Sequence, residues 1–74
     1  MASAVHLLRR GDPALAIAVM ARQLAQGDTV TAVLLDGAAA AGLPAGVTIR
    51  RVPEDLSHEA LLELIFAGDS VVTW

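Results

Sequence analysis

The chain has 74 residues, 55% of them hydrophobic and 18% charged, and five basic and eight acidic side chains give it a net charge of −3. This length fits one small domain, residues 1–74, and the acidic balance excludes nonspecific nucleic-acid binding through a basic surface. Because the chain has no cysteine, it forms no disulfide, no cysteine zinc site and no thiol nucleophile.

The apolar fraction is high for so small a domain, since a small globule has too much surface for so few polar groups. We therefore expect an oligomer that hides an apolar face. No apolar run reaches the roughly 18–20 residues of a membrane span. Arg9 and Arg10 follow the first apolar stretch, whereas a secretory signal places its positive charge before it. These patterns favour a cytoplasmic protein without membrane contact.

Residues 4–8 form a short, largely apolar run, which is typical of a buried parallel strand. Asp12 and Pro13 then predict a helix start, with the aspartate as N-cap and the proline as first helical residue. The helix should continue to about Gln26.

The helix over residues 13–26 is apolar around most of its circumference, which predicts burial on more than one side. One side should pack on a sheet, and the other should contact another subunit. We expect Val19 and Met20 at that subunit interface.

Residues 29–35 are rich in β-branched side chains and predict a second strand, which ends at Asp36-Gly37. A short helical turn is expected over residues 38–41, with Asp36 as its cap. Residues 47–52 alternate apolar and polar side chains, which predicts a strand nearer the edge of the sheet.

Ser57 is the expected N-cap of a last helix that stops at Gly68, and residues 70–74 form the last predicted strand. The order strand–helix–strand–short helix–strand–helix–strand predicts a small three-layer α/β fold. Its parallel sheet should have about four strands, with right-handed crossovers.

One sequence pattern occurs twice, at Gly27-Asp28-Thr29-Val30 and at Gly68-Asp69-Ser70-Val71. In both places an apolar helical stretch precedes the glycine and a β-branched run follows. The pattern predicts two helices, each ended by a glycine in the left-handed conformation, and each leading into a strand.

Ligands of open parallel sheets bind beyond the carboxyl ends of the strands. The candidate ligand-binding residues at that edge are Arg9, Arg10, Asp36 and Gly37. The two arginines could hold a small anion there. The alternative is that both arginines are solvated and pair with Asp12 or Asp36.

His6 lies inside the first predicted strand and could act as a proton carrier, although a hydrogen-bonded core histidine is the favoured interpretation. His58 should lie on the surface, and two separated histidines make no metal site. Trp74, the single tryptophan, should either fill the core or anchor an interface. No nucleophile motif, dinucleotide fingerprint or Walker loop is present, so we expect no enzyme activity, cofactor or metal.

An ordered set of short motifs spans nearly the whole chain. These are His6-Leu7-Leu8-Arg9-Arg10, a helix after Pro13, Gly27-Asp28, the strand Val33-Leu34-Leu35 running into Asp36-Gly37-Ala38, and the closing Trp74. The set resembles the DsrH/TusB branch of the DsrE/DsrF/DsrH superfamily. The chain departs from that family in having no cysteine, and in having Ala38 where the family has valine.

The resemblance implies a small α/β subunit of a sulfur-relay complex, in tRNA 2-thiouridine-type modification or in sulfur oxidation. Without a cysteine, the chain could only be a scaffold or partner of cysteine-bearing DsrE/DsrF-like subunits. The alternative function is a free-standing homo-oligomeric module that binds a small anion and has no role in sulfur transfer.

Overall fold

The computed structural model of the chain describes residues 2–11, 13–35, 37–39, 41–52 and 54–74. The elements are β1 (Ser3–Leu8), α1 (Ala14–Ala25), β2 (Thr29–Leu34), β3 (Thr48–Arg51), α2 (His58–Ala67) and β4 (Ser70–Thr73). The strands form one four-stranded sheet in the order β3-β2-β1-β4, and all three neighbouring pairs are parallel. This confirms an α/β protein with a four-stranded parallel sheet.

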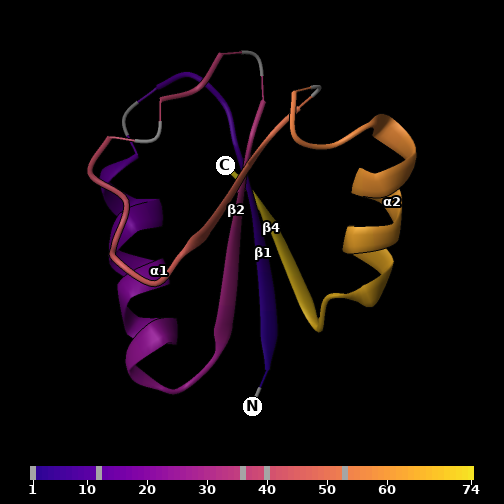
Figure 1. Ribbon diagram of the computed structural model, residues 1–74. Coiled ribbons are helices and arrows are strands. Elements are labelled where there is room, and N and C mark those ends of the chain that lie inside the picture. Colours follow the sequence, from indigo (N-terminus) through magenta and orange to yellow (C-terminus); the bar gives the residue numbers. More distant parts are fainter. Residues whose placement is uncertain (1, 12, 36, 40, 53) are drawn as a thin grey trace.

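The two helices lie on opposite faces of the sheet, so the molecule has three layers (Figure 1). The strand order explains this arrangement. The connection from β1 to β2 and the connection from β3 to β4 run in opposite directions across the sheet. Two crossovers of the same hand that run in opposite directions place their helices on opposite faces.

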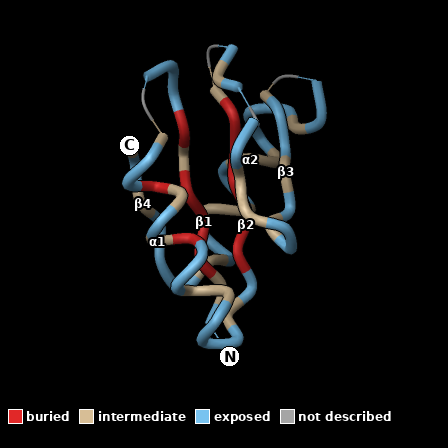
Figure 2. Tube along the Cα trace, turned by 90° about the vertical axis from the view of Figure 1, so that its left-hand side faces the viewer, coloured by how far each residue is buried: buried red, intermediate tan, exposed pale blue. Residues whose placement is uncertain are grey.

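The core follows the two central strands, where buried residues cluster (Figure 2). On the α1 face, Ala16 and Met20 of the helix pack against Leu8, Val30, Ala32 and Leu34. The edge strand β3 is mostly exposed, as its alternating sequence predicts, and the other edge strand, β4, is also mostly exposed. Burial is therefore concentrated in β1 and β2.

Helix α1 begins one residue later than its sequence predicts. Its N-cap is Pro13, whose carbonyl accepts the first intrahelical hydrogen bond from Ile17 at 2.8 Å and whose own side chain makes no capping hydrogen bond. The predicted cap, Asp12, lies outside the described residues. The predicted stop is confirmed, because Gly27 has a φ of +86°, which costs glycine little.

Helix α2 begins as predicted at Ser57, whose hydroxyl accepts from the Ala60 N–H at 3.1 Å. Its end is different. Gly68 is extended, with φ −75° and ψ 145°, so the prediction of a left-handed glycine is wrong here. A Cβ at Gly68 would lie 3.0 Å from Val5 Cγ2. A glycine at this position therefore allows the chain to pass close to β1.

The short helix predicted over residues 38–41 is not formed in the described part of this loop. Gly37 and Gly42, on either side of this segment, have φ values of +75° and +85°. A right-handed helix cannot continue through a residue with such a φ. The loop covers the β3 side of the α1 face instead, where Ala38, Leu43 and Val47 pack against the core.

The two Gly-Asp pairs have the same structural role on either side of β1. The Asp28 carboxylate, just before β2, accepts from the Ala2 N–H at 3.3 Å. The Asp69 carboxylate, just before β4, accepts from the Ser3 N–H at 2.8 Å. Both aspartates thus hold the first residues of the central strand, at the edge opposite the predicted ligand-binding edge.

Neither described helix is long and apolar enough to cross a membrane.

Candidate functional site

The most organised side-chain cluster is centred on His6 in β1. The imidazole is fully buried, and both of its ring nitrogens have a partner. Nε2 lies 2.6 Å from Gln23 Oε1 of α1, and Nδ1 accepts a hydrogen bond from the Trp74 indole N–H at 2.9 Å. The two ring planes are nearly parallel, inclined by 13°, and their centroids lie 6.0 Å apart. One side chain therefore links β1, α1 and the residue after β4.

These contacts define the tautomer of the His6 ring. An indole N–H can only donate, so Nδ1 must carry a lone pair, and the proton of the neutral ring sits on Nε2. Nε2 then donates to Gln23 Oε1. A histidine with both nitrogens engaged in the core has none free for a substrate or a metal, which agrees with the structural interpretation of His6.

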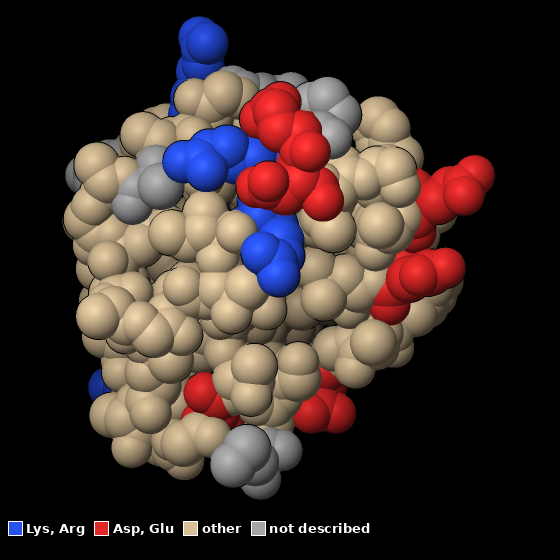
Figure 3. Space-filling model, in the orientation of Figure 1, with Lys and Arg blue, Asp and Glu red and all other residues tan. Residues whose placement is uncertain are grey.

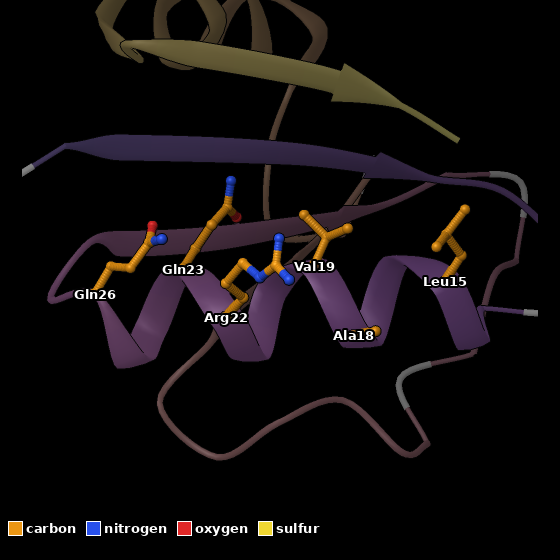
Figure 4. A pocket seen from close by; sticks show the side chains of 6 residues that line it. All are labelled: Leu15, Ala18, Val19, Arg22, Gln23 and Gln26. Atoms are coloured by element: carbon orange, nitrogen blue, oxygen red, sulfur yellow. The ribbon is translucent and has the colours of Figure 1, made fainter.

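A groove of about 390 Å³ runs along one side of α1. Its lining comes from successive turns of the helix: Leu15, Ala18, Val19, Arg22, Gln23 and Gln26. Figure 4 shows these side chains along the helix, on the side of β1 and β4. Because Gln23 also bonds to His6, the groove lies directly beside the buried cluster. Its lining is part apolar and part polar.

The carboxyl edge of the sheet brings two of the predicted ligand-binding residues together. The Arg10 guanidinium lies over Gly37, so close that a Cβ there would be 3.2 Å from Nη2. Arg9 is exposed beside it in sequence, and Asp36 lies outside the described residues. The pairing of Arg10 with the β2 end was not evident from the sequence, because it depends on a glycine that leaves room for the guanidinium.

Several large apolar side chains are exposed. Phe66 and Leu62 of α2 are 86% and 55% exposed, Leu15 of α1 is 66% exposed, and Val71 of β4 is 38% exposed. No described residue of α2 is fully buried. A groove between α2 and the strands β2 and β3, lined in part by Thr31, Thr48 and Leu64, separates this helix from that side of the sheet.

The three residues predicted at a subunit interface differ in position. Met20 is fully buried between α1 and the sheet, so it offers no surface to a partner. Val19 is half-buried and lines the α1 groove. Trp74 is half-buried as well and packs against the core cluster.

Among the described residues, no three histidine or acidic side chains lie close enough to hold a metal ion. No buried side-chain nitrogen or oxygen in the described ranges lacks a hydrogen-bond partner. The described interior therefore contains no orphaned polar group that calls for a ligand.

No protein-family model matches the chain, and no curated protein or solved structure is significantly similar to it.

The hydrogen-bonding roles of Gln23 and Asp69 were not evident from the sequence. Gln23 looked like a solvated position at the polar edge of a helix, and Asp69 looked like part of a helix stop. The hydrogen-bonded residues His6 and Gln23 are 17 positions apart in the sequence, and Ser3 and Asp69 are 66 positions apart. Such long-range hydrogen bonds leave no local pattern, although a polar residue on an otherwise apolar helix is a useful signal.

Proposed function

We propose that this chain is a non-catalytic subunit that acts by binding another protein chain. The exposed apolar surface of α2 carries the proposal, above all Phe66, which is 86% exposed, and Leu62, one helical turn before it. Residues four apart lie on the same side of a helix, so the two side chains form one apolar surface. Exposed apolar side chains grouped in this way are typical of interaction sites.

The internal chemistry supports the same conclusion. The buried histidine is engaged at both nitrogens, and the chain has no thiol, so neither group is free to act as nucleophile or base. We therefore propose that the function lies in the surface. From the resemblance to the DsrH/TusB branch, the partners to test first are cysteine-bearing DsrE/DsrF-like chains of a cytoplasmic sulfur relay.

The test begins with the mass of the purified chain by native mass spectrometry, alone and after affinity purification of the tagged protein from its own organism. We expect an oligomer or a complex with cysteine-bearing relatives. The double variant Leu62→Ser/Phe66→Ser should lose its association with a different protein chain through α2 and keep its fold. Glu63→Ser, an exposed polar position on the same helix, is the matched control and should leave it unchanged. A monomer that recovers no partner would refute the proposal.

A second candidate function is small-anion binding at the carboxyl edge, and the approach of Arg10 to Gly37 favours it. The guanidinium lies where the ends of β1 and β2 meet, which is the usual position of ligands in parallel sheets. Titration with phosphate or sulfate should raise the melting temperature of the wild type and leave Arg10→Gln unaffected. No shift with either anion would refute this candidate.

A further inference from the structure

The two edges of the sheet differ sharply in charge. Strand β3 carries two consecutive exposed arginines, Arg50 and Arg51, and the acidic Glu54 and Asp55 follow it. In Figure 3, where β3 is nearest the viewer, blue and red side chains lie next to one another on this side. Strand β4 (Ser70–Thr73) contains no charged residue. Charges on an edge strand discourage pairing with another strand, so β3 is protected and β4 is not.

The outer side of β4 presents backbone groups that can pair. The Trp74 N–H donates inward, to the Leu7 carbonyl of β1 at 3.0 Å. Backbone N–H and C=O groups alternate sides along a strand. The N–H and C=O of Val72 therefore also point toward β1, and those of Val71 and Thr73 point outward. Among the described residues, β1 is the only strand paired with β4.

We propose that β4 pairs with the β4 strand of a second copy of this chain, antiparallel across a two-fold axis at Val72. Val71 then pairs with Thr73 of the second copy through the outward N–H and C=O groups, and the two sheets become one of eight strands. A two-fold contact uses the same patch on both copies, and the uncharged β4 edge meets itself without repulsion. The same contact at β3 would bring arginines of the two copies together.

The surfaces beside β4 enlarge this contact. A standard interface takes about 800 Å² from each partner, against a total accessible surface of 4548 Å² for this chain. Pairing of four residues is too small by itself. On one face the groove beside α1, with the exposed Leu15, lies on the β1 and β4 side of the helix (Figure 4), and on the other face Val71 is partly exposed. The groove, with its mixed apolar and polar lining, and Val71 can both add area to the contact.

Introduced cysteines test the proposed axis directly, because the chain has none of its own. In a non-hydrogen-bonded antiparallel pair the Cα atoms are about 4.5 Å apart, within the range of a disulfide. We therefore expect Val72→Cys to form a disulfide-linked dimer under mild oxidation. Ile49→Cys is the matched control, a half-buried β-branched residue on the β3 edge and on the same sheet face, and it should stay unlinked.

A charge placed on each edge gives an independent readout without new covalent chemistry. Thr73→Glu should bring an unpaired carboxylate against Val71 of the second copy and weaken the dimer at least about tenfold. Thr48→Glu changes another exposed threonine, on β3, and should leave the dimer intact. Light scattering over a range of protein concentrations measures both.

The proposal rests on the proposed function, yet the two can fail separately. If the wild type associates but Val72→Cys does not cross-link, or Thr73→Glu associates as well as Thr48→Glu, then the β4 contact is wrong and another surface binds. If the chain is a monomer at all concentrations but binds a different protein, the β4 dimer is refuted and the proposed function stands. Cross-linking of Ile49→Cys to the same extent would also overturn the assignment.

Discussion

Removing the indole N–H while keeping an aromatic ring tests the link between His6, Gln23 and Trp74. In Trp74→Phe the buried Nδ1 of His6 loses its donor. A buried polar group without a partner costs about 1–3 kcal/mol, and the smaller ring adds less because Trp74 is only half-buried. We expect a loss of about 2 kcal/mol in the free energy of unfolding. For a domain of this size that lowers Tm by about 8–16 °C.

The measurement is thermal and urea unfolding followed by far-ultraviolet circular dichroism at one protein concentration. Fluorescence is unsuitable because Trp74 is the single tryptophan. Phe66→Leu is the control for changing an aromatic residue, and since Phe66 is 86% exposed its stability should stay within about 0.5 kcal/mol of the wild type.

A double-mutant cycle with His6→Leu separates the hydrogen bond from the loss of ring area. Removing both partners leaves neither Nδ1 nor the indole N–H unpaired, and the loss of the His6 bond to Gln23 is common to the single and the double variant. The double variant should therefore be less destabilised than the sum of the singles by at least about 1 kcal/mol. Additive effects, or a Trp74→Phe variant as stable as Phe66→Leu, would refute the argument that this hydrogen bond stabilises the core.

The remaining predictions concern residues at the ends of helices and the starts of strands. Asp69→Ala should lower stability in urea by about 1 kcal/mol and Asp28→Ala by less, since their bonds to the start of β1 measure 2.8 and 3.3 Å; equal effects would contradict this order. Gly68→Ala should destabilise by about 1–3 kcal/mol through its contact with the buried valine of β1, and shortening that valine to alanine should partly relieve it. Gly27→Ala should lower the free energy of unfolding by about 1 kcal/mol through its positive φ alone. Shortening Val5 to alanine should not relieve that loss, because a Cβ at Gly27 meets no other atom. Ser57→Ala should cost about 1 kcal/mol in thermal unfolding by removing the cap of α2, and an unchanged Tm would contradict that role.

The sequence predicted the elements well because their signals are local. A short apolar run identified β1, a run rich in β-branched residues identified β2, and Ser57 identified the start of α2. The helical turn predicted over residues 38–41 is not formed in the described part of that loop, because the helix propensity of alanine is a small effect beside two flanking glycines with positive φ. The different end of α2 at Gly68 depends on a contact with Val5, 63 positions earlier, and such a contact has no local signature.

Less of the candidate site was predictable. The burial of His6 was expected, because its neighbours in the strand are apolar. Met20 was predicted at a subunit interface, but it is fully buried against the sheet of its own chain. An apolar helix side looks the same in sequence whether it meets its own sheet or another chain. The exposed side of α2 was not predicted, since Phe66 and Leu62 are apolar like the residues that face the sheet.

The position of β1 has a consequence for how the chain folds. This strand, near the start of the chain, pairs with β2 at a separation of 26 residues and with β4 at a separation of 66. Contacts between distant parts of a chain form late, and they slow folding. Until β4 pairs with β1, a partly folded chain would expose the unpaired edge of β1, and unpaired strand edges promote aggregation. Refolding should accordingly be slow for the length of the chain, with yields that fall as protein concentration rises.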